Sequence, residues 1–443
     1  MLIEFTVGNY LSFKDKATFS MVKSESDNNL SEICSFEPKP DSKFRLLKTA
    51  AVYGANSSGK SNLVKSFDFM RTFVIYSVSS PSYFLGERNI ATTPFFLSAS
   101  TLEKPSFFEI IFIENNIRYR YGFEANADVV KSEWLYRSKE NRETMLFERE
   151  GQSIEYNKRS FKEATDFISP ENIVKKTRSE SLFLSVLKQF DGTISSVVIN
   201  WFENFYVISG IMDLHYRNFT INLFDVNSDF RNWSLKILSQ FDISNVKLKE
   251  KESLISKNRL NEKNDRVSES LSKYLEKPKF TIKKQVFFSH IFLGSDSKPA
   301  GEIEFPMQFE SAGTQKLFYF LGPLYEAIHS GRTIIVDELD SRFHPLLTTL
   351  IIEFFSNKNN SKAQLIFTSH DTSLLKKEIF RRDQIWFTEK DKYNSTQLYS
   401  LDEYKEYYAR KDASFAKDYL NGKYGAVPVF GNKDELLEII YGK

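Results

Sequence analysis

Residues 50–62 read AAVYGANSSGKSN, and the rest of the chain can be interpreted from them. Residues 50–53 form a short apolar run typical of a buried strand, and apolar residues at helical spacing begin again at Leu63. Between them, the segment from Gly54 to Ser61 matches G-x-x-x-x-G-K-[ST] at every position. A strand, this loop and a helix in succession are the context in which the pattern forms a phosphate-binding loop.

The chemistry of such a loop is specific. Its glycines let the backbone close around phosphates, its N–H groups point inward, and the helix N-terminus adds favourable partial charge. We expect Lys60 to reach the β- and γ-phosphates and the Ser61 hydroxyl to hold Mg²⁺. A glycine-rich turn before a helix could match by chance, but the surrounding strand and helix favour a nucleotide site. The predicted nucleotide contacts in the loop are Gly54, Asn56, Ser57, Ser58, Gly59, Lys60, Ser61 and Asn62.

A second acidic site is needed for the metal and for water, and residues 333–338, TIIVDE, supply it. Asp337 follows a hydrophobic strand and can reach Mg²⁺ directly or through water. Glu338 is placed to polarise the attacking water as general base. Two acids capping a strand would be the structural alternative.

Histidines differ in context. His370 ends the strand LIFTS and could donate a hydrogen bond to the γ-phosphate, or could be a surface residue at a strand end. His344 could contact a partner subunit or could equally be a helix-entry residue. We interpret His215, His290 and His329 as structural.

Residues 310–316, ESAGTQK, open a helix predicted to run to His329. Ser311, Gly313 and Thr314 would make its N-terminus a second anion-binding position, with an ordinary N-capped helix as the alternative. One chain cannot bring both helix starts onto the same γ-phosphate if they lie on different parts of the sheet. We therefore expect a head-to-tail homodimer that sandwiches nucleotide.

The remaining pattern predicts an α/β fold with a split parallel sheet. Residues 106–157 read as an antiparallel meander with a hairpin turn at Asn115-Asn116, and residues 161–240 read as helical. Residues 247–279 mix charges of both signs and predict a solvated helix plus a mobile loop, with a nucleic-acid arm as the alternative. The predicted domains are an N-terminal lobe at 1–160, a helical insertion with charged linker at 161–279, and a C-terminal lobe at 280–443.

Composition sets broad limits. The 443 residues are enough for roughly two to three domains, and a net charge of +2 is too balanced to indicate nucleic-acid binding. Cys34 is the single cysteine, which excludes a disulfide within one chain, fits a reducing cytoplasm and favours a core role. The sequence shows neither a signal peptide nor about 18 uninterrupted apolar residues, so we expect no membrane contact.

This set of motifs resembles the ABC-type ATPases of the SMC and RecF class. It most closely resembles the short prokaryotic AAA-type ATP-binding proteins of the RloA, abortive-infection kind, which are related to the ATPase half of OLD-family proteins. The resemblance makes Gly54–Ser61 Walker A, Ile334–Glu338 Walker B, Ser311–Gly313 a signature-like SxG, Asp340 part of the D-loop and His370 the switch histidine. The stretches FTVGNYLSFKD (5–15), FRRDQIWFTEKD (380–391) and DYLNGKYGAVP (418–428) also resemble that family.

The chain departs from the family pattern in three respects. The signature lacks the full LSGGQ form, although Gln315 and Lys316 follow. No Q-loop glutamine can be assigned, since residues 94–98 contain none and Gln189 is spaced like a helix residue. Residues 372–443 are too few for a Toprim nuclease domain and lack its acidic cluster, so we expect any nuclease to be a separate protein.

The resemblance implies a cytoplasmic ABC-like P-loop ATPase that uses ATP and Mg²⁺. It further implies an antiphage sensor or motor that controls a separate effector, such as a nuclease or toxin. One alternative is a RecF-like ATPase that binds DNA in repair. Its basic strip would comprise Lys175, Lys176, Arg178, Lys247, Lys249, Lys283 and Lys284. Another is a non-catalytic nucleotide-dependent scaffold, against which Glu338 argues.

Overall fold

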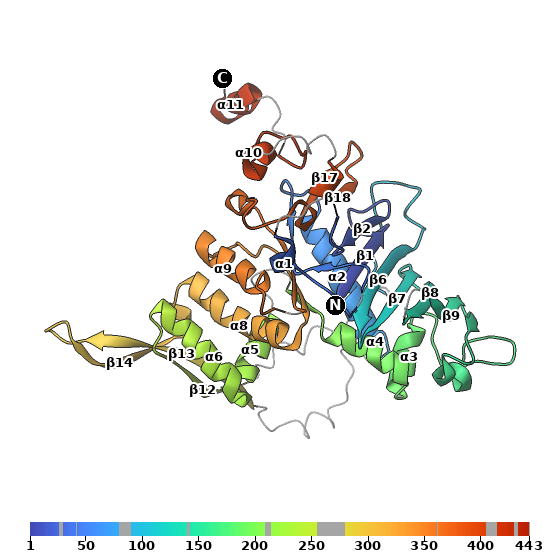
Figure 1. The fold of residues 1–443 in the computed structure, drawn as a ribbon, viewed down its shortest axis with the longest axis horizontal. Helices are drawn as coiled ribbons and strands as arrows, with labels where there is room; N and C mark the ends of the chain where they lie inside the picture. The colour runs from blue at the N-terminus through green and yellow to red at the C-terminus, as the bar shows by residue number, and fades with distance from the viewer. Residues whose placement is uncertain are drawn as a thin grey trace, which may run out of the picture. The chain divides into compact units, whose positions relative to one another are not determined.

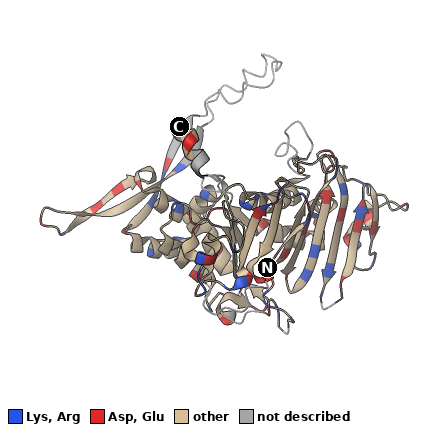
Figure 2. Cartoon of the chain, turned by 90° about the horizontal axis from the view of Figure 1, so that it is seen from above, with Lys and Arg blue, Asp and Glu red and all other residues tan. Residues whose placement is uncertain are grey.

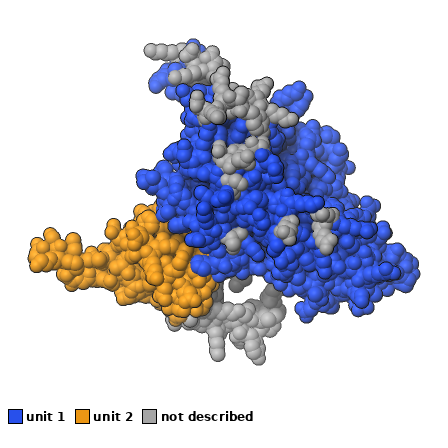
Figure 3. Space-filling view, viewed as in Figure 1, with its two compact units in different colours: residues 1–212, 326–443 blue, residues 213–325 orange. Residues whose placement is uncertain are grey.

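The computed structural model describes residues 1–25, 30–40, 42–78, 90–139, 142–208, 214–254, 280–360, 362–404, 414–428 and 433–442. Contacts divide the chain into two compact units, residues 1–212 with 326–443 and residues 213–325 (Figure 3). The predicted division at residues 160 and 279 stays a prediction, because it groups residues by sequence pattern rather than by contacts.

A six-stranded sheet forms the centre of the first unit, in the order β11-β15-β16-β5-β17-β18. Figure 1 labels its strands β17 and β18. Its strands are β5 (Thr49–Tyr53), β11 (Tyr206–Ile208), β15 (Thr333–Val336), β16 (Gln364–Thr368), β17 (Ile385–Lys390) and β18 (Thr396–Ser400). Neighbours from β11 to β17 pair in parallel, and β18 is antiparallel to β17. Every residue of β5, β15 and β16 is buried, which explains their continuous apolar runs.

A seven-stranded antiparallel sheet belongs to the same unit, in the order β10-β9-β8-β7-β6-β1-β2. Its strands are β1 (Leu2–Gly8), β2 (Ala17–Ser20), β6 (Ser106–Glu114), β7 (Ile117–Ala125), β8 (Val130–Ser138), β9 (Thr144–Glu150) and β10 (Ser153–Tyr156). Asn115 and Asn116 join β6 to β7 with φ of 50° and 62°. Asparagine tolerates this left-handed conformation, as a two-residue hairpin requires.

Helix α2 (Lys60–Tyr76) shares one continuous apolar core with both sheets. Phe67 of α2 stacks on Phe5 of β1 with ring centroids 3.8 Å apart, and Phe19 of β2 lies 4.9 Å from Trp386 of β17. This core fixes the start of α2, and therefore the end of the phosphate loop, relative to the sheets. The other elements of this unit are α1 (Ser31–Cys34), β3 (Ser35–Phe36), β4 (Leu46–Leu47), α3 (Phe183–Gln189), α4 (Thr193–Glu203), α9 (Pro345–Phe355), α10 (Phe415–Leu420) and α11 (Lys433–Tyr441).

The second unit combines helices with a three-stranded antiparallel sheet in the order β12-β13-β14. Its elements are α5 (Leu214–Val226), α6 (Ser228–Leu238), β12 (Asn245–Leu254), β13 (Phe280–Leu293), β14 (Pro299–Pro306) and the first part of α8 (Ala312–Ser330). Phe318 of α8 joins them, since its ring lies 5.7 Å from Phe224 of α5 and 5.6 Å from Phe288 of β13.

The predicted fold class is confirmed: a parallel P-loop sheet, split by an insertion, accompanies an antiparallel β layer. Two local predictions were wrong. Residues 247–254 form part of β12 rather than a helix, because Lys247 and Lys249 lie on the exposed face of a strand whose period of two is hidden by its charges. Residues 24–44 are polar, contain Pro38 and Pro40 and predict a loop, but they include α1 and β3. The rest of the predicted linker, 255–279, lies outside the described residues.

None of the helices that the structure describes is both long enough and apolar enough to cross a bilayer.

Candidate nucleotide-binding site

The predicted phosphate loop connects β5 to α2. The Lys60 ammonium donates hydrogen bonds to the carbonyl oxygens of Gly54, at 2.7 Å, and Ala55, at 3.0 Å. The Lys60 side chain therefore folds back over the loop in which phosphate is expected to bind. Asn56 and Ser57 are exposed, Ser61 and Asn62 are half-buried, and Ser58 and Gly59 are buried.

Two positions in the loop admit only glycine. A Cβ on Gly54 would lie 2.4 Å from the carbonyl oxygen of Thr388. A Cβ on Gly59 would lie 2.3 Å from Oγ1 of Thr396, and the φ of Gly59 is 119°. The glycines of the sequence pattern are thus needed for close approach to strands β17 and β18 as well as for phosphate.

Hydroxyl groups from both ends of the chain hold the loop. Oγ of Ser58 lies 2.6 Å from Oγ1 of Thr388, and Oγ1 of Thr396 donates to the carbonyl oxygen of Ser58 at 2.8 Å. Oγ of Ser12 lies 2.8 Å from Oγ1 of Thr396 and accepts from the Asn62 amide at 2.8 Å. Sequence analysis missed Ser12, Thr388 and Thr396, since no spacing in the sequence relates them to the loop.

Asp337 and Glu338 follow β15, and Thr368 at the end of β16 contacts both. Oγ1 of Thr368 donates to Asp337 Oδ1 at 2.6 Å and accepts from the backbone N–H of Glu338 at 2.7 Å. Glu338 has a φ of 52°, a left-handed conformation that costs a non-glycine residue about 1–3 kcal/mol. Such backbone strain concentrates at functional sites, which supports a functional role for the Glu338 carboxylate.

The predicted lysine, acids and histidine lie close enough to affect one another's charge. Burial lowers the pKa of Lys60 to about 8, and the carboxylates of Asp337, Glu338 and Asp340 act in the opposite direction. Partial burial is the main cause that lowers the pKa of His370, and the positive charge of Lys60 lowers it further. The carboxylates of Asp340, Glu338 and Asp337 act in the opposite direction. Since this pKa lies below its ordinary value of 6.5, the His370 imidazole is neutral at pH 7 and can donate one hydrogen bond.

Strand order explains this convergence. β15 pairs with β16 and β16 pairs with β5, all in parallel, so their carboxyl ends meet at one edge of the sheet. That edge carries the phosphate loop after β5, the acids after β15 and His370 after β16. The backbone N–H of His370 also donates to Asp340 Oδ2 at 3.2 Å. Oδ1 of Asp340 is buried without a hydrogen-bond partner in the described part of the chain.

The signature-like segment belongs to the second unit. Oγ of Ser311 accepts from the Thr314 N–H at 3.1 Å and lies 2.8 Å from the Thr314 hydroxyl, so Ser311 caps helix α8. Gly313 is half-buried in the first turn of this helix. The role predicted for these residues across a dimer stays a prediction.

Other candidate residues take structural positions. His344 is the N-cap of α9 and accepts from the Leu346 N–H at 3.3 Å, which favours its interpretation as a helix-entry residue. Cys34 is buried, as expected of a core residue. His290 bonds within the second unit, His329 lies in the last turn of α8, and the side chain of His215 is outside the described residues.

A surface hollow of about 310 Å³ lies beside the phosphate loop. Its walls include Ser12 and Asn62, which hold the loop, and the exposed apolar side chains of Phe96 and Leu97. Its size is in the range of small-molecule sites, so a bound nucleotide has open space next to the loop.

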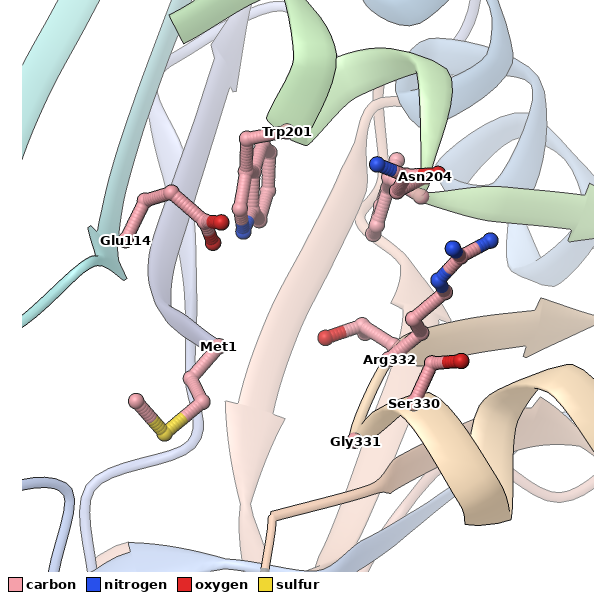
Figure 4. A pocket seen from close by; sticks show the side chains of 9 residues that line it. Met1, Glu114, Trp201, Asn204, Ser330, Gly331 and Arg332 are labelled. Atoms are coloured by element: carbon pink, nitrogen blue, oxygen red, sulfur yellow. The ribbon is translucent and has the colours of Figure 1, made fainter. Parts of the chain in front are cut away.

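A smaller cavity of about 190 Å³ lies near Thr333, where β15 begins, at the opposite end of that strand from Asp337. Figure 4 shows Glu114 and Trp201 on one side of it and Arg332 on the other. The volume is below the roughly 300 Å³ at which small-molecule sites begin, so this cavity does not compete with the loop as a nucleotide site.

Three of the seven residues of the proposed basic strip form ion pairs with acids. Lys247 and Lys249 both pair with Glu304, at 2.6 and 2.7 Å, and Lys284 pairs with Asp225. Figure 2 shows acidic and basic residues interspersed along the strands rather than segregated. The side chain of Lys283 is outside the described residues. These pairings give no support to a DNA-binding surface at those lysines.

Comparison with known families agrees with this geometry. A family model described as "AAA domain, putative AbiEii toxin, Type IV TA system" matches residues 50–376. The chain belongs to this AAA family. The matched range contains the phosphate loop, the acids after β15 and His370, and it confirms the predicted resemblance to abortive-infection ATPases.

Solved structures similar to this AAA protein include an SMC head domain from Thermotoga maritima, at 10% identity and a TM-score of 0.39. That match covers 90% of this chain and 98% of the other. A second is an SMC head bound to the C-terminal winged-helix domain of ScpA, at 12% identity and a TM-score of 0.41, covering 90% and 97% of the two chains. A search of curated proteins finds no match.

Proposed function

We propose that this AAA protein binds ATP with Mg²⁺ and hydrolyses it. The observation that carries the proposal is the meeting of the phosphate loop and its Lys60 with the acids after β15 and with His370, at the carboxyl ends of three adjacent parallel strands. A structural cluster of capping acids would not need a buried lysine at the start of a helix behind a glycine-rich loop. The family supports nucleotide binding in the same region.

The donor chemistry of the site fits a magnesium nucleotide. Mg²⁺ keeps several waters and takes one or two protein oxygens together with phosphate oxygens, so Ser61 and Asp337 are sufficient protein ligands. The described residues contain no group of three acids, histidines or cysteines that would bind a metal without a nucleotide. The buried, unpartnered Oδ1 of Asp340 leaves one acceptor for water or ligand.

Each side chain has a separate task. Loop N–H groups and Lys60 bind and orient the phosphates, and Mg²⁺, when bound, neutralises their charge. Glu338, exposed at the strand end, accepts a proton from the attacking water. His370, neutral at pH 7, donates a hydrogen bond to a γ-phosphate oxygen as negative charge develops there.

We further propose that hydrolysis is controlled by assembly. Ser311, Gly313 and Thr314 of one copy would complete the nucleotide site of another in a head-to-tail dimer, and closure would signal to a separate effector protein in antiphage defence. The exposed N-terminus of α8, with Ser311 already capping it, supports this role.

The testing experiment compares wild type with two variants. Lys60→Ala should abolish ATP binding in isothermal titration calorimetry, and Glu338→Gln should bind ATP but hydrolyse it at least about 100-fold more slowly. Undiminished hydrolysis by Glu338→Gln would contradict the assignment of the general base. Size-exclusion chromatography with light scattering would show whether the Glu338→Gln variant dimerises only with ATP.

A further inference from the structure

Strands β13 and β14 continue past the end of the three-stranded sheet as a two-stranded ribbon. β12 pairs with β13 only as far as Ser289, whereas β13 runs on to Leu293. Figure 1 shows this ribbon extending beyond α5 and α6. β14 is the last strand of the sheet, and its outer edge pairs with no strand in the described part of the chain. An unpaired edge presents backbone N–H and C=O groups to any strand of suitable sequence.

Exposed apolar side chains lie on both faces of the ribbon: Ile291 shares a face with Glu302, and three others lie on the opposite face. Phe292, Ile303 and Phe305 share this face, because residues two apart on a strand and residues opposite each other in register point the same way. Their side chains are 49%, 41% and 42% exposed. On β14 itself, this face carries the apolar side chains of Ile303 and Phe305 and ends at Gly301, which has no side chain.

The opposite face of β14 carries acids in two different states. Glu304 pairs with Lys247 and Lys249, which hold the pKa of its carboxyl down at about 2. Glu302 is exposed and has no ion pair within the described residues. A strand added to this edge would meet one carboxylate that forms no direct ion pair, although the Lys247 ammonium interacts with it electrostatically, and it would meet apolar side chains of β14 on the other face.

The size and charge of this surface indicate which kind of molecule could bind at the β14 edge. The exposed apolar face amounts to roughly 250 Å², about a third of the roughly 800 Å² that each partner contributes to a stable interface. Face-to-face contact with a second copy is therefore too small. Antiparallel edge-to-edge pairing of two β14 strands about Glu302 sets the two Glu302 carboxylates opposite each other, and like charges directly opposite destabilise a sheet.

We infer that β14 is a docking edge for an extended segment of a separate protein, which adds as a further strand. That segment carries Lys or Arg opposite Glu302 and apolar residues on either side of it. Backbone hydrogen bonds supply the affinity that the small apolar area lacks, and the basic residue sets the register. This inference goes beyond the proposed ATPase activity and does not depend on it.

The docking edge is connected to the signature-like segment. His290, opposite Ile303 in the ribbon, contacts Glu310 through Nε2 at 2.7 Å and the carbonyl oxygen of Asp242 through Nδ1 at 3.0 Å. The two partners are hydrogen-bond acceptors, and each contacts a different nitrogen of the imidazole. Glu310 immediately precedes Ser311, so contacts lead from β14 through Ile303, His290 and Glu310 to the residues expected to face nucleotide.

The test titrates fluorescein-labelled peptides into the full chain and follows anisotropy, without nucleotide. The probe is Ser-Thr-Val-Lys-Val-Thr-Val-Ser, and matched peptides replace its lysine by glutamate or its central valine by proline. Wild type should bind the lysine peptide at least about tenfold more tightly than either control. The variant Glu302→Lys should reverse the preference between the lysine and glutamate peptides, and Asp296→Lys in the ribbon turn should leave it unchanged.

Thermal unfolding checks that the variants fold, which is expected because the ribbon lies outside the sheet's three-stranded part. Three results would overturn the inference: no saturable binding of the lysine peptide, equal binding of the proline peptide, or an unchanged preference in Glu302→Lys. Because none of these measurements involves ATP, a failure here is separate from a failure of the proposed ATPase.

Discussion

Replacing Thr396 by valine exchanges its hydroxyl group for a methyl group and leaves the shape of the side chain nearly unchanged. That hydroxyl donates to the carbonyl oxygen of Ser58 at 2.8 Å and lies 2.8 Å from the hydroxyl of Ser12. All three residues are buried, so no water replaces the lost donor. A buried acceptor left without its donor costs about 1–3 kcal/mol.

The cost falls on the conformation of the phosphate loop, because the Ser58 carbonyl is in the loop itself. If the whole penalty acts on the binding-competent conformation, the dissociation constant of ATP rises by about 5- to 150-fold. Calorimetric titration of Thr396→Val with ATP and Mg²⁺ measures this rise, and Thr396→Ser, which keeps the hydroxyl, should stay within about twofold of wild type.

A global loss of stability is the competing explanation, so thermal unfolding is measured on the same samples. Thr18→Val is the matched control, since the Thr18 hydroxyl bonds Thr6 at an exposed position of the antiparallel sheet. Wild-type ATP affinity and wild-type unfolding temperature in Thr396→Val would together refute the argument that β18 holds the loop.

Three further outcomes are expected. Because burial lowers the pKa of Lys60 to about 8, its ammonium loses charge as the pH rises through about 8, and the ATP affinity measured by calorimetry should fall over that range. Lys60→Arg should remove this pH dependence. The control Lys65→Arg, at an exposed position of α2, should retain it. Glu338→Gln should accumulate an ATP-bound dimer visible by light scattering, unlike Glu353→Gln on the exposed surface of α9, and a monomer with ATP bound would count against head-to-tail closure. His344→Ala should lower the free energy of unfolding by about 1 kcal/mol, and His344→Asn, which can also cap a helix, should not; loss of dimerisation instead would revive a partner contact.

Residues close in sequence were the predictable part of the fold. The loop from Gly54 to Ser61, the acids after β15 and the hairpin at Asn115-Asn116 are local patterns in which residue type and spacing determine conformation. Their elements were identified to within a few residues. Strand β12 was missed because Lys247 and Lys249 obscure its alternation.

Contacts between distant segments could not be predicted. Ser12, Thr388 and Thr396 hold the phosphate loop through hydroxyl groups, and hydroxyl residues are too common in sequences for their positions to be informative. The role of His344 as a helix cap could be identified only from the structure, since its sequence context fitted two interpretations equally. The left-handed φ of Glu338 has no sequence signal, because glutamate rarely adopts it.

Strand order has a consequence for biosynthesis. β5 emerges early from the ribosome, yet its two neighbours, β16 and β17, lie at residues 364–368 and 385–390, and Thr396 follows them. At about 5–20 residues per second, the phosphate loop waits on the order of tens of seconds before either neighbour of β5 in the parallel sheet has been made. A ribosome-bound chain is therefore expected to be unable to bind ATP until Thr396 has been translated. Chains that terminate before Thr396 would then be inactive rather than act as unregulated ATPases.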